Sequence, residues 1–203
     1  NAELQAQINE LKAQIEAQAQ KEAASESAIE TAFNKIKLGG YGELHYNNLK
    51  NDVTTAEKKE LDLHRFVVFV GYDFTDRVRF MSEVEIEHAL VKDLGTKGGE
   101  VEVEQAYIEF DIAKSYKARG GLMLVPVGII NERHEPPTFY GVERNPIESS
   151  IIPATWWEGG ASFSGVYDNG LAFDVMLSSA LNIDPTNYNL RSGRQKVSFA
   201  KAE

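Results

Sequence analysis

Hydrophobic residues near the start of the chain recur at alternating steps of four and three. They are Leu4, Ile8, Leu11 and Ile15. This spacing is typical of the seam of a coiled coil. The seam weakens between residues 18 and 25 and resumes at Ile29. We predict a helix over residues 1–36 that acts as an oligomerisation stalk; the alternative is a lone helix that packs on its own domain.

From residue 37 onward the hydrophobic period changes to two. The clearest segment is 77–90. Its apolar positions are Val78, Phe80, Val84 and Ile86, and its charged positions are Arg77, Arg79, Glu83, Glu85 and Glu87. Strict alternation predicts a β-strand with one apolar face and one charged face. In segment 101–112 the same pattern places Glu109 and Asp111 on the polar face.

Similar patterns predict strands at 37–47, 61–74, 116–127, 158–166 and 171–178, and one more from residue 194. Tight turns at 75–76, 114–115 and 168–170 alternate with longer polar loops at 48–60, 92–99 and 182–193. We therefore expect about eight antiparallel strands, joined alternately by short turns and long loops.

Two β architectures fit this alternation. In a soluble sandwich or barrel the apolar face is buried, whereas in a transmembrane barrel the apolar face meets lipid and the charged face lines the lumen. Strand length and the asymmetry between turns and loops favour the membrane. Aromatic residues near the strand ends, where interfacial girdles belong, favour it too; they are Tyr41, Tyr46, Tyr72, Phe74, Tyr116, Phe163 and Tyr167.

The segment from 128 to 160 interrupts the pattern. It contains Pro136, Pro137, Pro146 and Pro153, which lack a backbone donor, so we predict neither a regular strand nor a helix. Loops of this length in a compact domain are functional or disordered, and the aromatic and aliphatic content argues against disorder.

Four stretches resemble bacterial outer-membrane porins of the phosphate-selective porin O and P family. They are KLGGYGELHYN, HRFVVFVGYDFTDRVRFMSEVEIEHA, VEVEQAYIEFDI and, most specifically, GLMLVPVGIINERHEPPTFYGVERNPIESSIIPATWWEGGASFSG. The resemblance covers the chain after about residue 36, and a coiled-coil segment also precedes the barrel in some proteins of that group. It implies a trimeric barrel of roughly 16 strands, a general or anion-preferring diffusion channel, and a loop folded into each pore.

The chain departs from that family in two respects. About eight strands would close a barrel filled by side chains, so we expect residues 37–203 to be part of a larger barrel. An anion pore needs rows of Arg and Lys, whereas the predicted pore wall is acidic. It comprises Glu83, Glu85, Glu87, Glu109 and Asp111. Phosphate selectivity is therefore not predicted.

We expect loop 128–160 to fold inward and constrict the pore. Its charged residues, the predicted constriction, are Arg133, His134, Glu135, Arg144 and Glu148. Arg133, His134 and Arg144 would then face the acidic wall, and the field between opposite charges would select solutes. The alternative is that these charges form ordinary solvated ion pairs. Trp156 and Trp157 are expected to anchor the loop rather than to stack on sugars.

Composition excludes several functions. The net charge is -10 and the pI is about 5.0, which argues against nucleic acid as a partner. The chain has no cysteine. The acidic wall could hold Ca²⁺ weakly, but the four histidines lie in different segments without metal-ligand spacing, so no metal site is predicted. No catalytic constellation or cofactor motif is present, and we predict no enzyme.

The sequence thus predicts an all-β transmembrane antiparallel barrel preceded by an α-helical coiled coil. The predicted function is an outer-membrane porin, embedded in outer-membrane lipid and homotrimeric, that lets small hydrophilic solutes or ions diffuse passively. The N-terminal helix would lie in the periplasm. The alternative is a soluble or surface-attached β-domain on a coiled-coil stalk, which serves adhesion or ligand binding.

Overall fold

The computed structural model describes residues 2–89, 98–152 and 154–194, which divide into an N-terminal unit, Asn1–Lys37, and a second unit, Leu38–Glu203. The first unit is helix α1, Ala2–Asn34, which confirms the predicted helix except for its last two residues. No residue of α1 is buried, and Leu4, Leu11 and Ile15 are each about 60 % exposed. No described helix is long and apolar enough to cross a bilayer.

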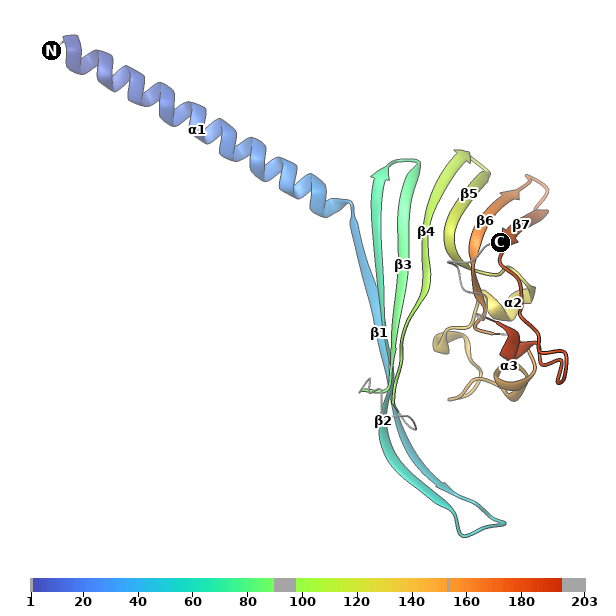
Figure 1. The fold of residues 1–203 in the computed structure, drawn as a ribbon. Coiled ribbons are helices and arrows are strands. Elements are labelled where there is room, and N and C mark those ends of the chain that lie inside the picture. Colours follow the sequence, from blue (N-terminus) through green and yellow to red (C-terminus); the bar gives the residue numbers. More distant parts are fainter. Residues whose placement is uncertain (1, 90–97, 153, 195–203) are drawn as a thin grey trace. The chain divides into compact units, whose positions relative to one another are not determined.

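The second unit is built on one sheet (Figure 1). Its strands are β1 (Ile36–Lys50), β2 (Glu57–Thr75), β3 (Val78–Glu87), β4 (Val101–Ala113), β5 (Tyr116–Leu124), β6 (Trp157–Val166) and β7 (Ala172–Ser178). They lie side by side in chain order, and each pair from β2 to β7 is antiparallel. The seven strands form an open sheet rather than a closed barrel. The strand predicted from residue 194 falls almost entirely outside the described residues.

The loop predicted at 48–60 is shorter than expected. Strand β1 runs to Lys50 and β2 starts at Glu57. The side chain of Asn51 accepts hydrogen bonds from the backbone N–H groups of Val53 and Thr54, both at 2.8 Å. Such an Asx turn reverses the chain tightly, which sequence polarity alone did not reveal. Most of the loop predicted at 92–99 lies outside the described residues.

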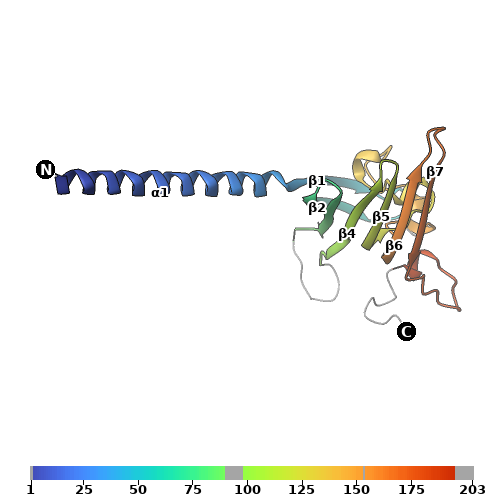
Figure 2. The same ribbon diagram turned by 90° about the horizontal axis from the view of Figure 1, so that it is seen from above.

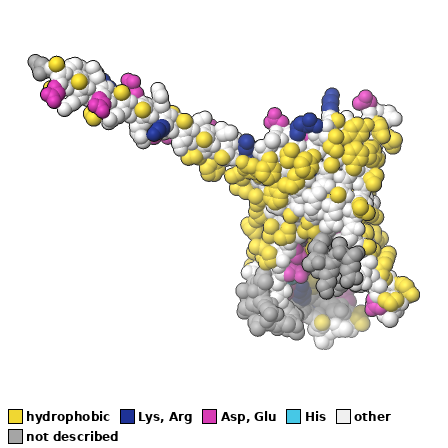
Figure 3. All heavy atoms as spheres, turned by 45° about the horizontal axis from the view of Figure 1, so that its top comes forward, with side chains coloured by type: hydrophobic (Ala, Val, Ile, Leu, Met, Phe, Trp, Pro, Cys, Tyr) yellow, Lys and Arg dark blue, Asp and Glu magenta, His cyan; other side chains and the backbone are white. Residues whose placement is uncertain are grey.

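The two faces of the sheet have opposite character. Among the described residues, only four hydrophobic residues are buried, against twelve polar or charged ones. Glu83 and Glu158 are fully buried, whereas Phe66, Phe110 and Leu177 are between 45 and 83 % exposed. Figure 3 shows hydrophobic side chains covering much of the visible surface of the sheet. The alternation predicted for 77–90 therefore has its charged side inward.

A bulge in β4 changes which residues face inward. Glu83 pairs with Gln105, but the next residue, Val84, pairs with Val103. The extra residue, Glu104, therefore has no partner in β3 and is buried. A bulge places two consecutive side chains on one face, so Glu104 and Gln105 both point inward. Simple alternation did not predict this for Glu104.

Residues 128–156 lie on one side of the sheet (Figures 1 and 2). The prediction that segment 128–160 contains neither helix nor strand is wrong, because it holds short helical turns and the start of β6. Residues 128–156 contain α2 (Gly128–Asn131), the 3₁₀ turn η1 (Pro136–Thr138) and α3 (Pro146–Ser150), and β6 starts directly after them at Trp157. Pro136 and Pro146 open helical turns, where no backbone donor is needed. The side chain of Asn145 caps α3 by accepting from Ile147 and Glu148. A second 3₁₀ turn, η2, spans Arg191–Gly193.

Candidate functional site

Asn131 fixes the base of residues 128–156, called the inward segment below. Its Nδ2 donates to the carbonyl oxygens of Val125 at 2.8 Å and Trp156 at 2.7 Å, and its Oδ1 accepts from the backbone N–H of Trp156 at 2.7 Å. Asn131 is 2 % exposed. One side chain thus joins the chain entering the segment, after β5, to the chain leaving it, before β6.

His134 attaches the segment to the sheet. Its Nε2 lies 3.0 Å from a carboxylate oxygen of Glu104 on β4, and its Nδ1 lies 3.0 Å from the carbonyl oxygen of Asn131. Burial opposes protonation, but the hydrogen bond and charge of Glu104, with the charge of Glu135, outweigh it and raise the pKa of His134. The imidazolium form is thereby stabilised relative to that of a free histidine, and in this form both ring nitrogens donate to their acceptors.

Glu135 makes a second attachment, because its carboxylate accepts a hydrogen bond from the phenol of Tyr41 on β1. The neighbouring Glu83 is held by Gln105, whose Nε2 donates to it at 2.6 Å. The segment is therefore bound to the inner faces of both β1 and β4. The segment thus lies against the charged face of the sheet.

A polar cavity of about 220 Å³ lies between this segment and the sheet. Its lining separates into carboxylates, mostly from the strands, and arginines, mostly from the loops. The carboxylates are Glu43, Glu85, Glu87, Glu100, Glu102, Glu104 and Glu143, and the arginines are Arg65, Arg144, Arg191 and Arg194. Opposite charges that face each other across a hollow create a field that orients charged and dipolar solutes.

The loop arginines lie close enough to affect one another. Arg144 donates to Thr155 Oγ1 at 3.1 Å and to the carbonyl oxygen of His134 at 3.4 Å. Arg191 donates to the carbonyl oxygens of Glu148 at 2.7 Å and Ile152 at 3.2 Å. Burial, followed by the charges of Arg194 and Arg144, lowers the pKa of Arg191 to about 10. All three remain cationic at neutral pH.

Arg65 differs from the loop arginines because it lies on strand β2, among the carboxylates. Its Nε is 2.7 Å from a carboxylate oxygen of Glu43 on β1, and its Nη1 is 3.3 Å from one of Glu85 on β3. It therefore neutralises part of the acidic lining. The carboxylates of the lining still outnumber its arginines.

The predicted constriction residues do not all reach this cavity. Arg144 lines it, and His134 and Glu135 join the segment to the strands. Arg133 is exposed and lines a different hollow of about 570 Å³ on the segment. Glu148 is buried, but its carboxylate accepts from the side chain of Asn145 within α3.

The predicted wall residues fall into two groups. Glu83, Glu85 and Glu87 lie on β3 near the inward segment or its cavity. Glu109 and Asp111 instead bind cations of neighbouring strands: Glu109 pairs with Lys117 at 3.0 Å and with Arg119 at 2.7 Å, and Asp111 pairs with Arg79. The prediction that Glu109 and Asp111 face the loop arginines is therefore wrong, since cationic neighbours on their own face satisfy them.

Several residues of the cavity were missed from the sequence. Glu102 and Glu104 were hidden by the bulge, and Glu43 and Arg65 lie in predicted strands whose alternation is less regular than that of 77–90. Arg191 lies in a predicted polar loop and Arg194 at the start of a predicted strand, and neither position carried a recognisable signal. Of the carboxylates that line the cavity, only Glu85 and Glu87 on β3 were predicted from the sequence.

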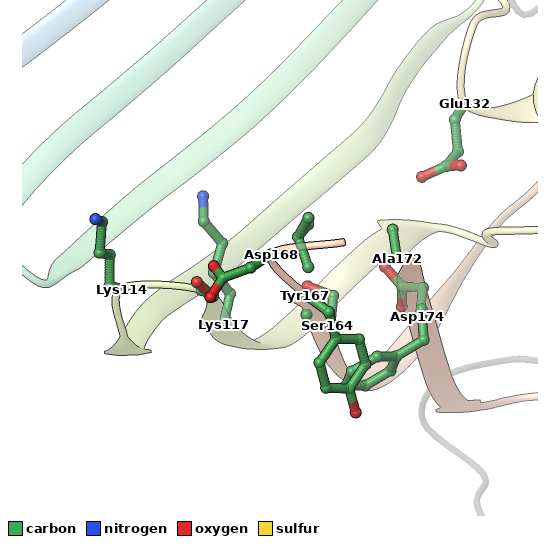
Figure 4. Close-up of a pocket in the computed structure, with 12 residues that line it drawn as sticks. Lys114, Lys117, Glu132, Ser164, Tyr167, Asp168, Ala172 and Asp174 are labelled. Carbon is green, nitrogen blue, oxygen red and sulfur yellow. The ribbon is translucent and has the colours of Figure 1, made fainter. Parts of the chain in front are cut away.

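A third hollow, of about 540 Å³, opens at the sheet end that carries the short turns. Lys114, Lys117, Glu132 and Asp168 project around it, and Tyr167 and Asp174 also contribute (Figure 4). None of these charged residues is buried. Exposed charges are screened by water and salt, so this hollow is a weaker candidate than the buried cavity.

Comparison with known proteins adds one relative. A protein of Aquifex aeolicus (strain VF5), described as uncharacterised, is 47 % identical over 134 residues, which are 66 % of this chain and 30 % of the relative. The aligned part of the chain thus spans about 30 % of the length of that relative. No protein-family model and no solved structure matches the chain.

Proposed function

We propose that the chain forms part of an outer-membrane porin, a water-filled channel for passive diffusion of small hydrophilic solutes or ions. The observation that carries this proposal is the inverted polarity of the sheet. Buried carboxylates such as Glu83 and Glu85 are costly in a dry core, whereas in a channel the same face borders water. The exposed apolar face suits contact with lipid.

The aromatic residues support the same orientation in a membrane. Tyr116 stacks on Phe163 with ring centroids 6.0 Å apart, and Tyr72 contacts Phe74 edge-on at 5.0 Å. Both groups lie at the short-turn end of the sheet. Interfacial aromatic girdles of outer-membrane barrels occupy such positions, and short turns face the periplasm.

We further propose a closed barrel of roughly 16 strands. Seven strands form an open sheet here, and the inward segment needs a lumen wider than an eight-stranded barrel provides. The Aquifex relative is more than three times as long as its aligned part, which leaves length for further strands.

Single-channel conductance in a planar bilayer, with the detergent-purified full chain and a salt gradient, tests the channel. We expect stepwise openings, often in threes, and a reversal potential that shows cation preference. Correctly inserted protein without conductance would end the proposal, and protein that is soluble without detergent would favour a β-domain on a stalk for adhesion or ligand binding.

Arg144→Gln should raise the ratio of cation to anion permeability by about twofold or more, because it removes a positive charge from the cavity lining. The matched control is Arg133→Gln, which makes the same change in net charge on the same segment but outside the cavity. Equal shifts in reversal potential for the two variants would show that this cavity does not control permeation.

We also propose that α1 associates with copies of itself in the periplasm. Gly40 and Gly42 lie beside Val67 and Arg65 of β2, so β1 runs in the direction opposite to β2. Since β2 ends at the short turn after Thr75, β1 starts at that same end of the sheet. The seam residues Leu4, Ile8, Leu11 and Ile15 are 41–61 % exposed and have no cover within α1. Burying such residues against partner helices would stabilise an oligomer.

Leu11→Asp should weaken self-association at least tenfold, since each buried leucine contributes roughly 1.5–3 kcal/mol. Ala13→Asp, on the other face of α1, adds the same charge and should have little effect. Light scattering of the purified chain over a dilution series measures both. The same oligomer population in the two variants would contradict the proposed seam.

A further inference from the structure

Three of the chain's four histidines lie together on the inner side of the sheet. They come from three consecutive parts of the chain: His45 from β1, His64 from β2 and His88 from just after β3. The rings of His45 and His64 are stacked 4.4 Å apart, and those of His64 and His88 meet edge-on at 5.6 Å. No local spacing in the sequence announces this cluster.

Asp62 joins two of these rings. Its carboxylate oxygens lie 3.1 Å from Nδ1 of His64 and 2.8 and 3.0 Å from Nδ1 of His88. Asp62 and His64 are two residues apart on one strand, so both side chains share a face. Ligand atoms about 2.1 Å from a zinc ion lie roughly 3.0–3.4 Å from each other, which is close to this spacing.

The backbone at His88 is also unusual. Its φ is +50°, in the left-handed region that a residue with a Cβ rarely adopts. This conformation costs on the order of 1 kcal/mol. It occurs directly after β3, and the imidazole of the same residue contacts Asp62.

His45 and Glu143 extend the cluster. His45 is 6 % exposed, and its Nε2 pairs with a carboxylate oxygen of Glu43; its Nδ1 makes no hydrogen bond and lies 3.4 Å from a carboxylate oxygen of Glu143. Ligand atoms of His45, His64 and Glu143 all lie within 4.8 Å of one another, as do those of Asp62, His64 and His88. A buried imidazole nitrogen without a donor or acceptor is costly unless a ligand occupies it.

We propose that Asp62, His64 and His88 bind a divalent transition-metal cation. His45 and Glu143 act as further ligands or orient these three ligand side chains. Imidazole and carboxylate together suit Zn²⁺, Ni²⁺ or Cu²⁺ rather than Ca²⁺ or Mg²⁺, which take oxygen ligands. An entry path exists, because His64 and Glu143 line the acidic cavity and His88 is 47 % exposed. The site does not depend on the channel.

A bound metal would also connect Glu143, in the inward segment, to β1 and β2. Metal binding and the position of the segment would then be coupled. The direct test is nevertheless binding, because binding is measurable whether or not the protein conducts.

Isothermal titration of the detergent-purified full chain with ZnCl₂ should give one site per chain, and Co²⁺ should give the visible absorption of nitrogen-containing coordination. His64→Gln and His88→Gln should each weaken Zn²⁺ binding at least tenfold. His88 is partly exposed, so its variant tests the site even if His64→Gln does not fold. Excess Ca²⁺ should not displace Zn²⁺.

The control is Glu83→Gln, which removes a carboxylate of the other candidate cluster and leaves the contact between His134 and Glu104 in place. It should leave Zn²⁺ affinity within about twofold. Ligand atoms of Glu83, His134 and Glu135 also lie within 4.8 Å of one another, so this control separates the two clusters. Loss of binding in Glu83→Gln but not in His64→Gln, displacement by Ca²⁺, or no stoichiometric binding would each overturn the proposal.

Discussion

Ile108→Arg is expected to destabilise the membrane-inserted protein by about 2–4 kcal/mol, the cost of an arginine on the lipid face near the bilayer centre. Ile108 lies about midway along β4 on the apolar face, paired with Phe80 and Gly120. The variant should shift the urea midpoint for folding into lipid vesicles. In a soluble protein, this partly exposed position would accept arginine at little cost.

Ile112→Arg is the matched control for depth. Ile112 is on the same face of the same strand, one residue before the strand end, and is 50 % exposed. Near the interface the cost of arginine falls to roughly 0–1 kcal/mol. Equal and small effects at the two positions would contradict a membrane-facing β4 and support the soluble alternative.

Asn131→Ala should have the second large effect, about 3 kcal/mol. The substitution removes three hydrogen bonds. The carbonyl oxygens of Val125 and Trp156 keep backbone N–H donors, whereas the N–H of Trp156 loses its acceptor. Each such hydrogen bond contributes about 0.5–1.5 kcal/mol. We expect a lower urea midpoint and faster hydrogen exchange at the peptide that contains Trp156.

The control is Asn187→Ala. Asn187 is exposed, and its side chain accepts one hydrogen bond, from the N–H of Asn189 at 3.1 Å. Surface substitutions of this kind usually change stability by less than about 0.5 kcal/mol. If Asn131→Ala changed stability no more than Asn187→Ala, Asn131 would not hold the base of the inward segment.

The Arg65 contacts show why the inner face cannot be judged by charge count alone. Arg65 is 7 % exposed and lies between Glu43 and Glu85, so its removal would leave two carboxylates without a cation. On β4 and β5 the same arrangement recurs, with Glu109 between Lys117 and Arg119. Ion pairs across neighbouring strands thus hold the sheet's inner face together, while the cavity keeps an acidic excess.

By itself, the sequence determined the period of each segment and therefore the type of each element. The three–four spacing of Leu4, Ile8, Leu11 and Ile15 predicted α1, and the alternation in 77–90 predicted β3 with a charged face. These are local properties, since a side chain's direction on a regular helix or strand follows from its position in the repeat. Turn residues likewise placed the strand ends near 75 and 114.

Only the tertiary structure decided which face is buried and which distant residues meet. A bulge flips the faces of β4 without changing its composition, and it brought Glu104 to His134. The partners of Glu109, the cluster of Arg144, Arg191 and Arg194, and the convergence of His45, His64 and His88 depend on strand register and loop packing. Such contacts join residues far apart in the chain, so no local period encodes them.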